Sequence, residues 1–290
     1  MISVVIPTYN RQRTILRAVN SVLNQTYQDL EVIVVDDCST DDTRAVVEAI
    51  ADPRVRYVCL EKNSGACTAR NKGITLSRGE YIAFQDSDDE WYPNKLVKQL
   101  AALEENEADI VFCGFEKLYR DDMRWIHPQG LSAHFCSQEE LLMTSLASTQ
   151  TFLGKAEVIR DVMFDASLPR MQDYDFIIRA AEKYRVYYLD QVLVTVYEQA
   201  DSITAGKRSY QKRLDITGKL LDKYPALRKA YPRWEVSMLK ITAHCLVMLK
   251  QDAAPVLKEI YKKEKSLANL GKLILYKLGL LYHIFDRADR

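Results

Sequence analysis

The sequence contains few cysteines and histidines, and neither kind is grouped. Its six cysteines are scattered over 290 residues, with no Cys-x-x-Cys pair. We interpret them as reduced, mostly buried thiols of a cytoplasmic protein. The histidines also follow no pattern, and we expect them to be structural or surface residues; they are His127, His134, His244 and His283.

The sequence also lacks any apolar run close to the roughly 20 residues that cross a membrane. After Met1 it enters the apolar segment 2–6 directly, without the basic region and cleavage site of a secretory signal. Basic and acidic residues balance, with 40 of each, so the net charge gives no sign of a nucleic-acid partner. We therefore expect a cytoplasmic protein that does not bind nucleic acid.

Strand and helix patterns alternate over the N-terminal third of the chain. Short apolar runs at residues 2–6, 31–35 and 81–84 predict buried strands, and residues 55–60 predict a further strand. Segments with helical spacing separate them. Such alternation predicts an α/β fold, in which helices flank a mostly parallel, Rossmann-like sheet. Ligands of these sheets bind beyond the carboxyl ends of the strands.

Polar loops follow three of these four strands. They are the segments 8–10, 36–37 and 86–88, which bring an aromatic ring and several carboxylates to one edge of the sheet. Four acids crowd into residues 86–90, and like charges this close repel one another. Hard oxygen ligands of this kind suit Mg²⁺ or Mn²⁺. The alternative is a solvated acidic turn ahead of a helix.

The pattern weakens after this point. We expect Pro93 to open a helix, and we expect a strand at residues 110–115 and two short strands at 186–189 and 192–197. Residues 150–154 show no clear period.

Towards the C-terminus, Leu, Lys and Tyr dominate at helical spacing, which predicts an all-helical appendage. We place the domain boundary so that residues 1–207 form the α/β domain and residues 208–290 the helical region. Apolar residues between 267 and 285 would form one face of a single helix. That helix either packs on its own domain or lies, as a basic amphipathic helix, on the surface of an anionic membrane.

Four segments occur in an order that is typical of a known family. They are VVIPTYNR at residues 4–11, VVDDCSTD at 34–41, NSGACTARNKGI at 63–74 and DSDD at 86–89. Together they resemble glycosyltransferase family 2 of the bacterial surface-polysaccharide type, with its GT-A fold, over residues 1–203. The resemblance implies an inverting enzyme that moves a sugar from a nucleotide-sugar, with UDP favoured, to a hydroxyl of a glycan or lipid-linked acceptor.

The resemblance also implies a set of nucleotide-binding residues. They are Pro7, Thr8, Tyr9, Arg11, Asp36, Asn63, Arg70, Asp86 and Ser87.

Some of these positions carry a defined role in the family. Tyr9 would stack on the base, Asp36 would accept the ring N–H of a pyrimidine, and Arg70 would approach the diphosphate. Asp86 would reach the ribose. Asp88 would hold Mn²⁺ or Mg²⁺, which bridges the phosphates.

The acid Asp89 stands directly after the proposed metal ligand. We expect it to cap the next helix or to orient its neighbours.

A second polar segment, Gln172-Asp173-Tyr174-Asp175, precedes a helical pattern. By resemblance Asp173 is the catalytic base, although Asp175 competes for the role and Asp173 could instead cap the helix. Gln172 replaces an acid that the family often has, and Gln199 replaces a histidine.

Two other interpretations compete with a glycosyltransferase. A nucleotidyltransferase would also use a Rossmann-like sheet and carboxylate-bound Mg²⁺, but no Gly-rich phosphate loop follows the first strand. The second competing interpretation is a catalytically inactive module that binds a nucleotide or serves as a scaffold. The intact Asp86, Asp88 and Asp173 argue against it, whereas Gln172 and Gln199 keep it open.

Overall fold

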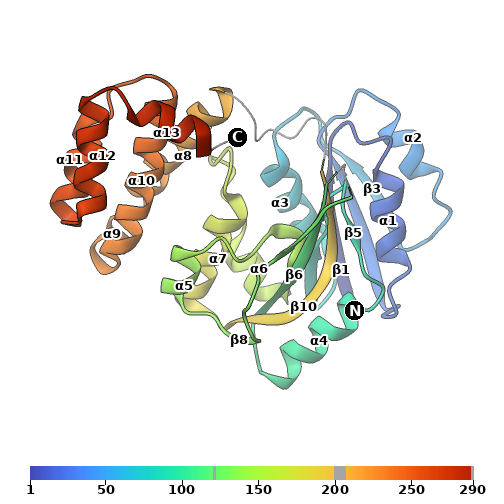
Figure 1. Cartoon of the computed structure of the whole chain (residues 1–290). Coiled ribbons are helices and arrows are strands. Elements are labelled where there is room, and N and C mark those ends of the chain that lie inside the picture. Colours follow the sequence, from blue (N-terminus) through green and yellow to red (C-terminus); the bar gives the residue numbers. More distant parts are fainter. Residues whose placement is uncertain (120–121, 199–206, 289–290) are drawn as a thin grey trace. The chain divides into compact units, whose positions relative to one another are not determined.

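The computed structural model describes residues 1–119, 122–198 and 207–288 (Figure 1). The chain divides into two compact units. Residues 1–167 and 172–198 belong to the first, and residues 168–171 belong with the C-terminal helices to the second.

Ten strands of the first unit form one sheet. They are β1 (Ile2–Thr8), β2 (Leu30–Asp36), β3 (Val55–Cys59), β4 (Tyr81–Phe84), β5 (Glu90–Trp91), β6 (Ile110–Leu118), β7 (Arg124–His127), β8 (His134–Phe135), β9 (Phe152–Lys155) and β10 (Val186–Tyr197). The helices are α1 (Ile15–Leu23), α2 (Thr43–Glu48), α3 (Ala66–Leu76), α4 (Lys95–Glu105), α5 (Gln138–Met143), the 3₁₀ helix η1 (Thr149–Thr151), α6 (Ala156–Val162) and α7 (Gln172–Lys183).

The strand order is β3-β2-β1-β4-β9-β6-β10-β5, and β7 and β8 pair with β6 and β10. The first four strands of this order run parallel, as predicted. Every residue of β1, the central strand of this parallel part, is buried. Helices cover both faces, with α1 on one side and α3, α6 and α7 on the other (Figure 1). The expected α/β architecture is confirmed, and the complete sheet is mixed.

Helix α3 packs directly against β1 because Gly73 has no side chain. A Cβ atom at this position would lie 2.3 Å from Cγ1 of Val5, which is well inside van der Waals contact. The close approach places Arg70, one turn earlier in α3, beside the carboxyl ends of the strands.

Two parts of the sheet differ from the sequence-based expectation. Residues 152–155 form β9, which runs antiparallel between β4 and β6; a strand of four residues is too short to show a period. The two strands expected at 186–189 and 192–197 are one strand, β10. Its register against β6 shifts between Leu189 and Val194, which explains the break in the pattern.

The expected start of the helix at Pro93 is also wrong. Helix α4 begins at Lys95, with Asn94 as its N-cap residue.

The described part of the second unit is all-helical, as expected. Its helices are α8 (Lys207–Lys223), α9 (Pro225–Ala230), α10 (Pro232–Met248), α11 (Ala254–Lys263), α12 (Leu267–Lys277) and α13 (Leu281–Ala288). The proposed boundary after residue 207 falls in the first turn of α8, and residues 199–206 lie outside the described part.

The single helix expected between residues 267 and 285 is two helices. Gly279 adopts a φ of +73° between α12 and α13, a conformation that ends helices and favours glycine.

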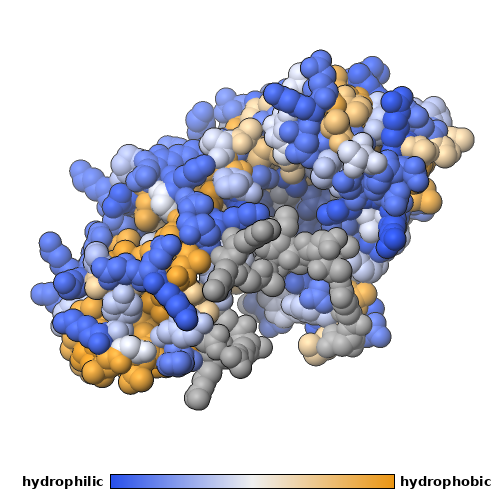
Figure 2. Space-filling model, turned by 90° about the horizontal axis from the view of Figure 1, so that it is seen from above, coloured by the Kyte–Doolittle hydropathy of each residue, from blue (hydrophilic) through white to orange (hydrophobic). Residues whose placement is uncertain are grey.

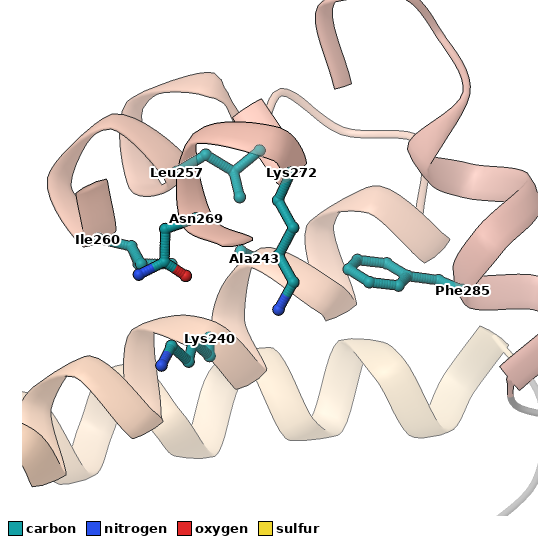
Figure 3. A pocket seen from close by; sticks show the side chains of 7 residues that line it. All are labelled: Lys240, Ala243, Leu257, Ile260, Asn269, Lys272 and Phe285. Carbon is teal, nitrogen blue, oxygen red and sulfur yellow. The ribbon is translucent and has the colours of Figure 1, made fainter. Parts of the chain in front are cut away.

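Helices α10, α11, α12 and α13 enclose a cavity of about 20 Å³ (Figure 3). Its lining residues are Lys240, Ala243, Leu257, Ile260, Asn269, Lys272 and Phe285. This volume holds about one water molecule, so the cavity is too small for a sugar or a nucleotide. Within the described residues, no helix has the length and apolar character needed to cross a membrane.

Candidate active site

The predicted site residues gather where β1, β2 and β4 end and where α7 begins. Pro7 and Thr8 are the last residues of β1 and are buried. The Oγ1 atom of Thr8 is buried and has no hydrogen-bond partner, which is unusual for a hydroxyl and leaves it available to a ligand. Tyr9 follows with 41% of its surface exposed.

The loops after β1 and β2 hold each other in place. The backbone N–H of Asn10 donates to Oγ of Ser39 (2.8 Å), and Oδ1 of Asn10 accepts from the N–H of Thr40 (2.8 Å). The N–H of Arg11 donates to Oγ1 of Thr43 (2.8 Å). No local sequence pattern indicates these links, because they join residues about thirty positions apart.

Asp36 lies at the end of β2 with 1% of its surface exposed. It accepts hydrogen bonds from the N–H (2.8 Å) and Oγ (2.6 Å) of Ser39 and from the hydroxyl of Tyr57 (2.6 Å). Burial, and then Asp36, raise the pKa of Tyr57, so this hydroxyl stays a donor. A carboxylate has about four acceptor positions, which leaves one for a ligand.

The neighbouring Asp37 anchors the next loop. Its two oxygens accept from the N–H groups of Ser64 and Gly65, both at 2.7 Å. Asn63, a predicted nucleotide-binding residue, is exposed just before this anchored turn.

Arg70 joins the end of β4 to the start of α7. It is 8% exposed, and its guanidinium donates to Oδ1 of Asp86 (2.9 Å) and to Oε1 of Gln172 (3.0 Å). Its Nε is buried without a hydrogen-bond partner. The structure therefore brings together Arg70, Asp86 and the segment of Asp173, which are far apart in the sequence.

Asp86, Ser87 and Asp88 follow β4. Ser87 is buried, and Oδ2 of Asp88 lies 3.5 Å from Nε of Arg11. Burial, and then the charge of Asp86, raise the pKa of Asp88. These groups fit a hard divalent cation, because its charge would relieve the repulsion between the two carboxylates and its ligands would be oxygens.

Asp89 does not cap α4, which starts six positions later at Lys95. It is 4% exposed and accepts from the backbone N–H of Tyr197 (3.2 Å). Burial, and then Asp86 and Asp88, raise its pKa. Its role is to join the acidic loop to β10.

Asp173 lies in the first turn of α7, partly exposed, and accepts from the N–H of Tyr174 (2.8 Å). Its pKa is raised, mainly by burial. The charge of Arg70 opposes this rise, and the charge of Asp86 adds to it. The competing Asp175 is fully buried and forms an ion pair with Arg179 (2.9 Å). Asp173 is thus partly exposed and within the electrostatic influence of Arg70 and Asp86, whereas Asp175 is buried in its ion pair.

Sequence reasoning missed two residues of this region. Arg17 of α1 donates to the backbone carbonyl of Asp88 and lies 3.7 Å above the ring of Tyr197. Gln85 is fully buried at the end of β4, and neither polar atom of its side chain has a partner. No local pattern marks either residue. Gln199 lies outside the described residues.

The family model described as glycosyl transferase family 2 matches residues 3–166, more than half of the chain. The chain is 33% identical over 245 residues to WcaA of Escherichia coli (strain K12), a glycosyl transferase named for colanic acid biosynthesis, and the match covers 80% of this chain and 85% of WcaA. It is 34% identical over 134 residues to WfgD of Escherichia coli, with 46% of this chain and 53% of WfgD covered. WfgD is named as a UDP-Glc:α-D-GlcNAc-diphosphoundecaprenol β-1,3-glucosyltransferase.

Solved structures share the fold at low sequence identity. Staphylococcus aureus TarS 1–349 in complex with UDP aligns with a TM-score of 0.65 at 20% identity, covering 96% of this chain and 91% of that one. A mannosyltransferase of Pyrobaculum calidifontis in complex with GDP-Man and Mn²⁺ aligns with a TM-score of 0.62 at 20% identity, covering 99% and 82%. The expected GT-A architecture is confirmed.

Replacing Asp89 by Asn should stabilise the protein in metal-free buffer at neutral pH. The change removes a buried charge that repels Asp86 and Asp88 and keeps an acceptor for the N–H of Tyr197. We expect a gain on the order of 1 kcal/mol, or roughly 2–4 °C in Tm. Thermal unfolding measures it, with the exposed Glu105→Gln as control.

The pH dependence of this gain follows from the raised pKa of Asp89. Below the usual aspartate range Asp89 is protonated in both the folded and the unfolded states, so Asp89→Asn and wild type should be equally stable. The difference should grow as the pH rises from the usual aspartate range to the raised pKa, and should be constant above it. Equal Tm values at neutral pH would show that the acidic loop is not strained by repulsion.

Proposed function

Because the chain belongs to glycosyl transferase family 2, we propose that it is an inverting glycosyltransferase that uses a UDP-sugar. The acceptor is a hydroxyl of a glycan or of a lipid-linked saccharide. The observation that carries the proposal is the buried Arg70, which links Asp86 to the helix that begins with Gln172 and Asp173. This contact supports the proposal because it joins Arg70, the proposed phosphate-binding residue, to the proposed metal-binding segment and to the helix of the proposed base.

The polar groups after β1 and β2 favour a uracil nucleotide. Asp36 retains one acceptor position, which suits the ring N–H of uracil. The exposed ring of Tyr9 is available to stack on the base, and the unpartnered Oγ1 of Thr8 can bond to the nucleotide. UDP is also the ligand of the TarS structure and the carrier in the name of WfgD, which supports the same choice.

Mn²⁺ or Mg²⁺ is the proposed cofactor, held by Asp88 with Asp86 beside it. When bound, the cation would stabilise negative charge on the leaving diphosphate. Arg70 supports the same task from the protein, because a guanidinium fork matches phosphate oxygens. Its unpaired Nε faces no competing protein acceptor.

Asp173 is the proposed general base. Its raised pKa makes it a stronger base than an ordinary aspartate. It would take the proton of the acceptor hydroxyl while that oxygen forms its bond to the anomeric carbon and the diphosphate leaves with the old bond's electrons. Attack from the face opposite the leaving group inverts the anomeric centre.

We further propose a cytoplasmic enzyme that contacts the membrane through α12, α13 and the turn between them. Leu267 is 89% exposed and Leu278 is 65% exposed, and Lys277, next to Leu278, is also exposed. Figure 2 shows hydrophobic side chains gathered on the second unit, at the lower left. Apolar residues next to lysines suit an anionic lipid surface, where a lipid-linked acceptor would be held.

Titration with UDP by calorimetry, with and without Mn²⁺, tests the donor site. We expect Mn²⁺-dependent binding of UDP in preference to GDP, and we expect Asp88→Asn to lose at least about tenfold in affinity, because a metal ligand is removed. Glu105→Gln, an exposed acid on α4, should bind like wild type. Absence of UDP binding in either condition would favour a dTDP or GDP donor or the non-catalytic interpretation.

Replacing Asp173 by Asn should leave UDP affinity unchanged and lower kcat by about 10²–10⁴-fold, since proton transfer is lost. In the wild type, kcat/KM should fall as the pH drops through the pKa of Asp173, and this fall should begin at a higher pH than for an ordinary aspartate. Turnover of a UDP-sugar with a hydroxyl acceptor measures both effects. Wild-type turnover by Asp173→Asn would make the assignment wrong.

Vesicle sedimentation tests the membrane contact. Wild type should pellet with phosphatidylglycerol vesicles and less with phosphatidylcholine vesicles, and the double variant Leu267→Glu/Leu278→Glu should stay in the supernatant. Leu16→Glu is the matched control, because Leu16 is also exposed (46%) but lies in the first unit. Equal pelleting of the double variant and wild type would exclude this surface as the contact.

A further inference from the structure

Three side chains that commonly bind metals meet outside the candidate active site. They are His134 of β8, Cys136 directly after β8, and Glu140 of α5, and their ligand atoms all lie within 4.8 Å of one another. Strand β8 pairs with Tyr187 and Tyr188, near the start of β10. The nucleotide-binding residues instead follow strand ends, so this cluster lies toward the opposite edge of the sheet.

The two separations that involve His134 are close to those of a tetrahedral site, and all three ligand atoms lie within 4.8 Å of one another. Zn–N, Zn–O and Zn–S bonds of normal length imply ligand separations of about 3.4–3.6 Å. Nε2 of His134 lies 2.9 Å from Oε1 of Glu140 and 3.8 Å from Sγ of Cys136. Shifts of a few tenths of an ångström would bring both separations to the tetrahedral values.

The hydrogen bonds of His134 prepare its Nε2 for a cation. Nδ1 lies 2.6 Å from the backbone carbonyl of Ser132, which can only accept, so Nδ1 carries a proton. Nε2 of the neutral ring then presents a lone pair to the Glu140 carboxylate. Nε2 of His134 and Oε1 of Glu140 would then be two acceptors 2.9 Å apart. Such a pair needs a positive charge between its atoms, which a second proton on the ring or a metal ion would supply.

The chain also fixes the backbone of the other two ligands. The N–H of Cys136 donates to the carbonyl of Val186 (2.9 Å). Oγ of Ser137 accepts from the N–H of Glu140 (3.1 Å) at the start of α5. The ligands are therefore held before any ion binds, as preorganised sites require.

We propose that His134, Cys136 and Glu140 bind one Zn²⁺ ion, with solvent as the fourth ligand. The mixture of sulfur, nitrogen and oxygen ligands suits Zn²⁺ and is a poor match for Mg²⁺ or Mn²⁺, which prefer oxygen. The site is thus distinct in chemistry from the carboxylates of the active site, and it does not depend on the proposed function.

Zinc here would stabilise the base-bearing part of the first unit. It would tie β8 to α5, and α5 packs on α7 (Figure 1). The hydroxyl of Tyr174 donates to the carbonyl of Leu142 (2.6 Å), and Nε2 of Gln138 donates to the carbonyl of Ile178 (3.1 Å). Since α7 begins with the Gln172–Asp173 segment, the role of the ion is to position this helix.

Cobalt substitution and zinc stoichiometry test the proposal in the full chain. Wild type should bind one Zn²⁺ per chain, and Co²⁺ in its place should give the near-ultraviolet charge-transfer band of a cobalt–thiolate bond. Cys136→Ser should lose the band. Cys59→Ser, which changes an exposed cysteine, and Asp88→Asn, which changes the active-site acid, should both keep it.

Thermal unfolding gives a second readout. Zn²⁺ at about 100 times its Kd should raise the Tm of wild type by several degrees, because it binds only the folded state, and should not raise that of Cys136→Ser. If Cys136→Ser does not fold, Glu140→Gln is the alternative variant for this test. It should weaken Zn²⁺ binding at least about tenfold. A wild type without the thiolate band, or a Cys136→Ser variant that keeps it, would overturn the proposal.

Discussion

The contacts of the buried Arg70 guanidinium organise the candidate site. A buried charge without a partner is costly, and here Asp86 on one side and Gln172 on the other supply the hydrogen bonds. Only one of these two partners is charged. Gln172 therefore fixes the position of Arg70 without neutralising it further, whereas an acid at the same place would add a second negative charge. The replacement that the sequence marks as a departure from the family leaves more positive potential at Arg70, and it also joins the start of α7 to the end of β4 through this residue.

The acidic loop after β4 shows the opposite situation. Asp88 and Asp89 are held near Asp86 with raised pKa values, so their charges are unfavourable in the folded protein. The guanidinium of Arg17, which donates to the carbonyl of Asp88, and the backbone N–H of Tyr197, which donates to Asp89, offset this repulsion only in part. Strain of this kind persists only where the surrounding fold is stable enough to impose it. The fully buried β1 and its parallel neighbours provide that stability, and a bound cation would gain affinity from the repulsion it relieves.

The parallel strands and their polar loops were predictable from the sequence, because a buried β-branched run that ends in acids is a local pattern. The partners of those acids were not. Ser39 and Tyr57 saturate most of Asp36, and Arg17 reaches the acidic loop from α1, through contacts that only the fold creates. Strand β9 was not predicted for the same reason. It forms because it pairs with β4 and β6 in the sheet, and its own residues show no alternation of apolar and polar side chains. At Gly279 the error has the opposite cause. The apolar pattern between residues 267 and 285 continues across this glycine and predicted one helix, but the positive φ of Gly279 separates α12 from α13.

The two proposed metal sites would bind different ions because their ligands differ in kind. Carboxylate oxygens at the strand ends suit a hard cation such as Mn²⁺ or Mg²⁺. A thiolate, an imidazole and one carboxylate around α5 suit a cation that stays in place. Both proposed sites would act on α7: Arg70 joins Asp86 of the first to Gln172 at the start of the helix, and Glu140 of the second lies on α5, which packs on α7. A base that must stay within hydrogen-bonding distance of an acceptor hydroxyl benefits from such support, and this links a site remote from the strand ends to the geometry of the reaction.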